Sequence, residues 1–265
     1  MPTAEGVQGA ERSESQHVQS LARGLSVIQA FDAEHADMTL SDVARRTGLT
    51  RATSRRFLLT LVDLGYMRTD GRMFTLTPQV LRLGHAYLSS MGLPQIAQPH
   101  LETLSAKLGE SVSVAVLDGV DILYIARVAT RRIMTVGISV GTRFPAYATS
   151  MGRVILASLD EDRLADYFAR AHVHPITDRT IHDEQSLRAE LDRVRRDGYS
   201  LVDQELEPGL RSIAVPIVNA SGEVVAAVNV STHTSLVTGD LVQTHLPALL
   251  EAAEAINLDL KASRH

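Results

Sequence analysis

The chain has 265 residues, a formal net charge of −5 and no cysteine. Its length favours two domains, each large enough to bury a core, and the missing cysteines exclude disulfide frameworks, cysteine-ligated zinc and thiol catalysis. The polar residues 1–19 contain no signal peptide, and no apolar run approaches the roughly 18 residues that span a bilayer, so we expect a cytoplasmic protein without a membrane partner.

The chain begins with a polar tail followed by a helix. Residues 1–19 are rich in Gln, Ser and Glu, and we expect them to be disordered. Between residues 21 and 31, the spacing of Leu21, Leu25 and Ile28 predicts the first helix.

Two further helices, separated by a tight turn, are predicted next. Leu40, Val43 and Ala44 form the apolar stripe of a short helix, and Gly48 ends it. Residues 50–64 resume helical spacing, with apolar residues on one side and arginines on the other. A short helix, a turn and a longer basic helix, in that order, predict a helix-turn-helix.

A β-hairpin is predicted directly after these helices. Residues 66–76 alternate around Asp70-Gly71, which is a strong signal for a two-residue hairpin turn. Arg68 and Arg72 lie where the wing of such a domain would meet phosphates. With the preceding helices, the hairpin predicts a winged helix-turn-helix DNA-binding domain over residues 20–76.

The distribution of charge supports a nucleic-acid partner for this domain. Residues 20–90 carry nine arginines against six acids, whereas residues 91–265 carry 16 basic and 22 acidic residues. A basic field confined to one module suits a polyanion, and arginine can bind guanine through two hydrogen bonds. We expect contacts with double-stranded operator DNA from Arg45, Arg46, Thr50, Arg51, Ala52, Thr53, Arg55, Arg56, Arg68 and Arg72.

A linker helix and a second domain are predicted for the rest of the chain. Thr77 and Pro78 begin a helix that runs to about residue 90, so residues 77–92 are the predicted linker and a candidate dimer contact. Strands are predicted over residues 111–117, 121–128, 132–139, 199–205, 211–218 and 224–231. Helices are predicted over residues 94–108, 149–157, 160–171, 183–196 and 241–262. This pattern predicts an α+β domain over residues 93–265 with a mixed, largely antiparallel sheet.

Several spaced motifs occur in the order found in one family of bacterial transcription factors. They are LSDVA (40–44), TGL (47–49), Arg56, Leu61, Gly65-Tyr66, Pro145, ATSMGRVIL (148–156), GYSLVDQE (198–205) and GLRSIAVP (209–216). The chain from about residue 21 to 255 therefore resembles the IclR (isocitrate lyase regulator) family. The resemblance implies a winged helix-turn-helix, a linker helix, a GAF-like effector-binding domain, no cofactor, and a homodimer or tetramer.

Two longer stretches indicate a narrower resemblance. Residues 130–154 and 202–233 are similar to the branch of the family that regulates the β-ketoadipate pathway (the PcaR, PcaU and PobR group). This resemblance implies a small carboxylate effector, an aromatic acid or its ring-cleavage product. The alternative within the family is a regulator of another small-carboxylate pathway.

The family resemblance also implies where the effector binds. Matching by motif, the effector-binding positions are Thr149, Ser150, Met151, Val202, Ser212, Asn229 and Ser231, and Arg143 joins them as a candidate cation for the effector carboxylate. Val202 and Ser212 stand where some glyoxylate-binding relatives have an acid and a cysteine, which favours a more apolar pocket with hydroxyl and amide donors. The helix start near Ser150 offers N–H groups to a carboxylate, and Arg143, Arg153 or Arg211 could offer a cation.

Other functions are less well supported by the residues. His172, His174 and His182 could bind a metal, but no cysteine accompanies them and their spacing is common by chance, so we expect no metal site. The segment around Ser150 lacks the glycine two residues before the serine that a nucleophile elbow requires, which argues against an enzyme. Two alternatives stay open: a constitutive architectural DNA-binding protein, with a second domain used only for oligomerisation, and an enzyme with an appended winged domain.

Overall fold

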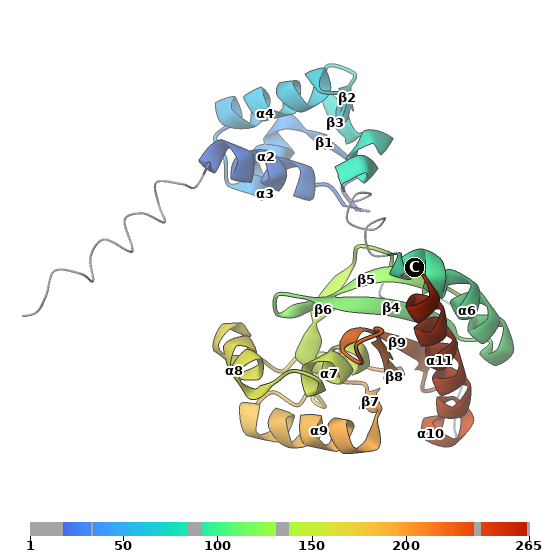
Figure 1. Ribbon diagram of the computed structural model, residues 1–265. Helices are drawn as coiled ribbons and strands as arrows, with labels where there is room; N and C mark the ends of the chain where they lie inside the picture. Colours follow the sequence, from blue (N-terminus) through green and yellow to red (C-terminus); the bar gives the residue numbers. More distant parts are fainter. Residues whose placement is uncertain (1–17, 33, 84–91, 131–137, 236–239, 264–265) are drawn as a thin grey trace, which may run out of the picture. The chain divides into compact units, whose positions relative to one another are not determined.

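The computed structural model describes residues 18–32, 34–83, 92–130, 138–235 and 240–263. The chain divides into two compact units, residues 1–89 and 90–265 (Figure 1). We describe each unit by itself.

The first unit packs three helices against a small sheet. The helices are α2 (Gln19–Gln29), α3 (Leu40–Thr47) and α4 (Arg51–Asp63), and the strands are β1 (Asp37–Thr39), β2 (Met67–Thr69) and β3 (Met73–Leu76). Val27, Val43 and Leu58 are fully buried in the core between the helices. The three predicted helices are confirmed. The sequence did not predict β1, which pairs antiparallel with β3 through only three residues.

Side-chain caps set the ends of α3 and α4. Thr39 and Asp42 form a reciprocal capping box at the start of α3, and Gly48 ends the helix with a left-handed φ of 68°. Thr50 then caps α4 by accepting a hydrogen bond from the Thr53 backbone N–H. The sharp turn between the two helices therefore follows from local sequence alone.

The turn of the hairpin differs from the prediction. Thr69 pairs with Phe74, so residues 70–73 form the connection, and the prediction of a two-residue turn at Asp70-Gly71 was wrong. The Asp70 carboxylate accepts hydrogen bonds from the backbone N–H groups of Arg72 and Met73, at 2.9 and 2.7 Å. These bonds satisfy two backbone amides of the connection.

The start of the predicted linker helix is visible. Thr77 accepts a hydrogen bond from the Gln79 N–H, and Pro78–Val80 form a 3₁₀ turn, η1, that continues into a helical segment over residues 81–83. The rest of the predicted linker, residues 84–91, lies outside the described residues.

The second unit contains a six-stranded sheet with the order β6-β5-β4-β9-β8-β7. The strands are β4 (Ser111–Asp118), β5 (Asp121–Val128), β6 (Arg143–Pro145), β7 (Ser200–Asp203), β8 (Leu210–Val218) and β9 (Val224–His233). Every pairing among the described strands is antiparallel, so the sheet is not mixed there. The predicted strand over residues 132–139 lies almost entirely outside the described residues, and β6 was not predicted.

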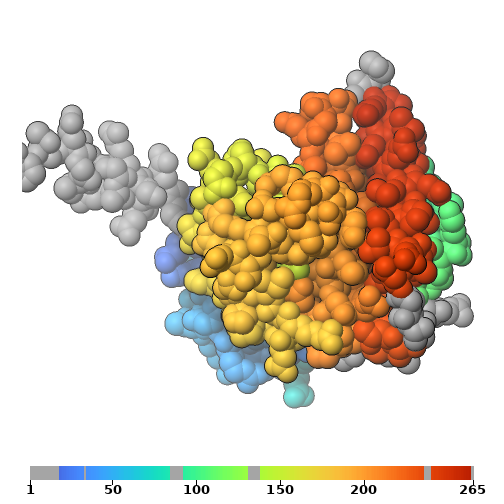
Figure 2. All heavy atoms as spheres, turned by 90° about the horizontal axis from the view of Figure 1, so that it is seen from below, coloured from blue at the N-terminus to red at the C-terminus, as the bar shows by residue number. Residues whose placement is uncertain are grey.

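Helices cover both faces of this sheet (Figure 1). On one side α6 (Leu93–Leu108) packs against α11 (Leu246–Ala262), and on the other α7 (Ser150–Ala157) lies across the central strands. Outside α7 lie α8 (Glu161–Arg170) and α9 (Glu184–Asp197), whose side chains form the yellow and orange surface in Figure 2. The predicted final helix is two helices, because α10 (Leu241–Thr244) ends before His245 and Pro247 lies in the first turn of α11.

Candidate functional site

The exposed face of α4 is cationic. Ser54, Leu58 and Leu61 are buried against the rest of the unit, whereas Arg51 and Arg55, one helical turn apart, are exposed. Two further exposed residues on this helix are Ala52 and Arg56. Within the described parts of the chain, no acid forms an ion pair with the arginines of α4. Their charge is therefore available to an external anion.

The remaining residues predicted to bind DNA have different surroundings. Arg45 is exposed and pairs with Asp42 at 2.7 Å, whereas Arg46 is held by Asp32, also at 2.7 Å. Thr50 and Thr53 bind each other at the start of α4. On the hairpin, Arg68 and Arg72 are exposed and have no ion pair among the described residues. The structure therefore presents the α4 and wing arginines more freely than Arg46.

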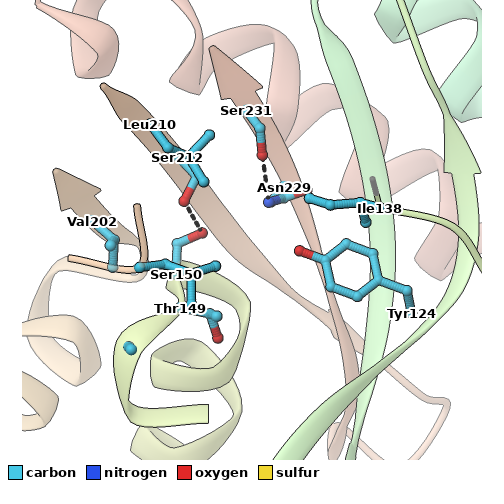
Figure 3. A pocket seen from close by; sticks show the side chains of 11 residues that line it. Tyr124, Ile138, Thr149, Ser150, Val202, Leu210, Ser212, Asn229 and Ser231 are labelled. Atoms are coloured by element: carbon cyan, nitrogen blue, oxygen red, sulfur yellow. Dashed lines mark hydrogen bonds between the residues drawn. The ribbon is translucent and has the colours of Figure 1, made fainter. Parts of the chain in front are cut away.

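A small cavity lies in the second unit between α7 and the sheet (Figure 3). It encloses about 330 Å³ of empty space, including the opening, but the centres of water molecules can occupy only about 10 Å³ of it, enough for about one water. The residues that line it are Tyr124, Ile138, Ala148, Thr149, Ser150, Val202, Leu206, Leu210, Ser212, Asn229 and Ser231.

Hydroxyl and amide groups from α7, β8 and β9 meet in this cavity. The Ser150 and Ser212 hydroxyls are hydrogen-bonded at 2.9 Å, and the Asn229 side-chain N–H donates to Ser231 Oγ at 3.0 Å (Figure 3). Asn229 Oδ1 is buried and has no hydrogen-bond partner. A buried acceptor without a donor is costly, so this atom is suited to a ligand that donates a hydrogen bond.

The local sequence around α7 places its first residue at the cavity. Thr149 caps the helix by accepting a hydrogen bond from the Gly152 N–H at 3.1 Å. Gly152 lies so close to the backbone of Ala146 that a Cβ there would stand 2.1 Å from the Ala146 carbonyl oxygen. This close approach requires glycine and brings the start of α7 against the sheet.

Most of the predicted effector positions converge on this cavity. Thr149, Ser150, Val202, Ser212, Asn229 and Ser231 all line it. Met151 is fully buried but belongs to the hydrophobic core and does not line the cavity. Arg143 is also outside the lining, because it pairs with Asp118 and Asp121 at the exposed edge of the sheet. The structure therefore does not bring Met151 or Arg143 to the cavity.

The two alternative cations are also engaged elsewhere. Arg153 is only 1% exposed and forms a bidentate ion pair with Glu205, while Arg211 lies 3.5 Å from Asp203. That separation is too long for a hydrogen bond, and Arg211 Nε has none. Neither arginine lines the cavity.

Sequence reasoning missed five lining residues. Ala148 and Leu210 lie within the family motifs, Leu206 directly follows one, and Ile138 lies in the stretch 130–154, so position in the sequence was a signal for these four. Tyr124 carried no such signal. Burial raises the pKa of the Tyr124 phenol to about 12, so its hydroxyl is protonated and available as a donor at neutral pH.

The structure also bears on the alternative sites. Among the described residues there is no cluster of three or more His, Cys, Asp or Glu side chains arranged to hold a metal. His174 instead contacts Tyr147 and the carbonyl oxygen of His172. None of the described helices is long and apolar enough to cross a membrane.

Comparison with known proteins matches both units. The family described as "IclR helix-turn-helix domain" matches residues 20–71, and "Bacterial transcriptional regulator IclR C-terminal" matches residues 85–258. The Pca regulon regulatory protein of Pseudomonas putida is 53% identical over 236 residues, covering 88% of this chain and 81% of that protein. The p-hydroxybenzoate hydroxylase transcriptional activator of Acinetobacter baylyi is 37% identical, covering 91% of each chain.

A solved structure is similar along nearly its whole length. The IclR homolog from Microbacterium hydrocarbonoxydans complexed with 4-hydroxybenzoate has a TM-score of 0.82 and 27% sequence identity, covering 92% of this chain and 99% of that chain. The two family models match one unit each, and the relatives extend over both units. The chain therefore belongs to the IclR family of bacterial transcriptional regulators.

Proposed function

We propose that the protein regulates genes of aromatic-acid catabolism, in the β-ketoadipate pathway, in response to a small aromatic acid or its ring-cleavage product. The observation that carries the proposal is the composition of the cavity. Its lining combines the apolar side chains of Ile138, Val202 and Leu206 with hydroxyl groups and the unpartnered Asn229 Oδ1. An apolar ring with polar groups at its ends is the chemistry that such a lining recognises.

The relatives support this assignment of ligand class. One is named for the Pca regulon, one for activation of p-hydroxybenzoate hydroxylase, and one was solved with 4-hydroxybenzoate. The identity of 53% to the first extends over most of both chains. A regulator of another carboxylate pathway would need a different set of polar groups at the cavity wall.

The small volume of the cavity supports a sensor rather than a passive binding site. It has room for about one water molecule, whereas a benzoate ring requires considerably more, so side chains must move to admit it. Leu206 lies in the connection between β7 and β8, and Leu210 is the first residue of β8, so rotation of these two side chains would enlarge the cavity. Ligand binding is then coupled to a change of conformation, as allosteric control requires.

DNA recognition would use the cationic face of α4. Two such helices in a dimer would enter successive major grooves, with Arg51 and Arg55 contacting base edges or phosphates and the wing arginines contacting the backbone. The effector would favour one arrangement of the two DNA-binding units over another. A coupling free energy of about 1–3 kcal/mol is typical for such control. A protein with this task acts in the cytoplasm, where the chromosome lies.

Thermal unfolding with candidate acids tests the proposal. The full chain is heated with and without protocatechuate, 4-hydroxybenzoate, β-ketoadipate and cis,cis-muconate, with glyoxylate as a non-aromatic control. An acid that binds the folded state raises the melting temperature, and one at a hundred times its Kd stabilises by about 2.7 kcal/mol. The same acid must then change the affinity for operator DNA in fluorescence anisotropy.

The outcomes separate the alternatives. A shift with one of the four acids, together with altered operator binding, supports the proposal. A shift only with glyoxylate indicates another carboxylate pathway. Operator binding that no acid alters, without any thermal shift, indicates a constitutive DNA-binding protein.

A further inference from the structure

Arg127, on strand β5, is half buried, and no Asp or Glu among the described residues forms an ion pair with it. Its Nη1 donates a hydrogen bond to Ser113 Oγ at 3.0 Å, but its Nε is buried and has no partner. In the part of the chain that the structure describes, no Asp or Glu forms an ion pair with it, and Nη2 makes no hydrogen bond. Arg153, by contrast, is buried and fully paired with Glu205. Arg127 therefore differs from Arg153 in having a buried N–H group without a partner and no described acid beside it.

The free atoms of Arg127 lie on one edge of its guanidinium. Nε–H and Nη2–H point in the same direction, and together they match the two oxygens of a carboxylate. Nη1, which lies on the other side of the group, is fixed by Ser113. The side chain is thus oriented with its carboxylate-binding edge unoccupied by any described residue.

Strand register places Arg127 beside the cavity. Ser113 on β4 lies opposite Arg127 on one side and opposite Asn229 of β9 on the other. Residues directly opposite on adjacent strands point to the same face, about 4.5–5.5 Å apart. Arg127 therefore shares the sheet face of Ser113 and Asn229.

A β-bulge brings Tyr124 to the same face. Ala115 pairs with Tyr124 and Val114 with Ala126, so Ile125 is an extra residue on β5. Without the bulge, residues three apart would point to opposite faces of the sheet. With it, Tyr124, which lines the cavity, and Arg127 lie on one face. Bulges that redirect a side chain next to a binding site are common.

We propose that Arg127 binds the carboxylate of the effector, with Nε and Nη2 donating to its two oxygens at the Tyr124 and Asn229 side of the cavity. The inference rests on the proposed function and assigns the cation that the site otherwise lacks. It also explains the fixed hydrogen bond to Ser113, because a guanidinium held in place loses little conformational entropy when the ligand arrives. The ring of the effector then lies against the apolar side chains of the lining, Ile138, Val202 and Leu206.

Isothermal titration calorimetry with paired ligands tests this role. The ligands are 4-hydroxybenzoate, protocatechuate, β-ketoadipate and cis,cis-muconate, each compared with the neutral compound in which every carboxylate is replaced by a primary amide. The proteins are the full-length wild type, Arg127→Gln, and the matched control Arg143→Gln. Arg143 is an arginine of the same sheet, ion-paired at its exposed edge.

A carboxylate bound by Arg127 gives a specific pattern. Wild type prefers the acid to the amide by at least about 10-fold, Arg127→Gln loses about 10–100-fold in affinity for the acid, and its affinity for the amide changes by less than about threefold. Arg143→Gln retains the wild-type preference. Without ligand, Arg127→Gln melts at or above the wild-type temperature, because it removes a desolvated charge that has no partner.

Contrary results are equally distinct. If wild type binds an acid and its amide equally well, or if Arg127→Gln keeps the wild-type affinity for the acid, Arg127 is not the carboxylate ligand although the proposed function stands. A large fall in the melting temperature of ligand-free Arg127→Gln would show a structural role and also overturn the inference. If wild type binds none of these ligands, the proposed function fails and this inference with it.

Discussion

Arg153 and Glu205 form a buried bidentate ion pair, with Nη1–Oε1 and Nη2–Oε2 distances of 2.7 and 2.5 Å. Arg153 comes from α7, whereas Glu205 lies in the connection between β7 and β8 that carries the cavity residue Leu206. The Glu205 carboxylate also accepts a hydrogen bond from the Ile181 backbone N–H. The pair therefore ties the connection that carries Leu206 to α7, whose first residue, Ser150, also lines the cavity.

Removing one partner of this pair is expected to be severe. Glu205→Gln leaves the buried Arg153 with only Glu190, whose Oε1 lies 3.8 Å from its Nη1, and we expect the free energy of unfolding in urea to fall by about 3–5 kcal/mol. The double change Arg153→Met with Glu205→Leu removes both charges and should cost less than Glu205→Gln alone. The exposed pair of Arg170 with Asp166 is the control, and Asp166→Asn should cost less than about 1 kcal/mol. If Glu205→Gln and Asp166→Asn lower the free energy of unfolding by the same amount, burial does not make the Arg153–Glu205 pair more important to stability than an exposed pair.

Gly152 is expected to tolerate no side chain. In Gly152→Ala the new Cβ would meet the Ala146 backbone, and we expect a loss of about 1–3 kcal/mol or more in chemical denaturation. Gly24→Ala is the matched control in helix α2, where the nearest atom to the new Cβ is 3.7 Å away. That change should be neutral or stabilise the protein by about 0.5–1 kcal/mol. A neutral Gly152→Ala would mean that α7 does not pack as closely as described.

Arg55 is expected to contribute sequence-specific DNA contacts. Arg55→Ala should weaken operator binding by about 1–3 kcal/mol while changing affinity for random DNA much less, if its guanidinium contacts a base. Arg68→Ala on the wing should weaken both by similar amounts, because phosphate contacts carry no sequence information. Fluorescence anisotropy titrations at fixed salt measure the affinity of each variant for operator DNA and for random DNA. Arg170→Ala, in the second unit, is the control. Equal losses on the two DNAs for Arg55→Ala would assign it to phosphate.

The stability of the DNA-binding unit is expected to fall in acid through Asp42. The Thr39 hydroxyl and backbone N–H donate to this carboxylate and lower its pKa below the ordinary value of 3.8. Since the folded pKa is the lower one, the stabilisation is complete above the unfolded pKa near 4 and is lost as the pH falls through the folded value. Asp42→Asn should therefore be less stable than wild type at pH 6 and approach it at pH 2.5. Melting curves recorded across this range would show parallel profiles if the cap made no contribution.

Local patterns in the sequence determined most of the secondary structure. Leu40, Val43 and Gly48 indicate a short helix and its end, and the structure confirms both, because helical periodicity and caps depend on residues three or four apart. The Asp70 turn shows the limit of such reasoning. There the type of turn depended on which backbone amides the carboxylate could reach, and the sequence indicated a tighter turn than the one that forms.

The composition of the cavity was decided by the tertiary structure. Family motifs indicated Ser150, Ser212 and Asn229, which line the cavity, but strict alternation along β5 assigns Tyr124 and Arg127 to opposite faces, and only the bulge at Ile125 reverses this. Arg143 stood in a recognisable motif, yet acids on neighbouring turns and strands bind it at the exposed edge. Periodicity is a property of a few adjacent residues, whereas strand register and the partners of a charge depend on residues far apart in the chain. The sequence by itself therefore determined the elements and the family, and the folded sheet determined which side chains line the cavity.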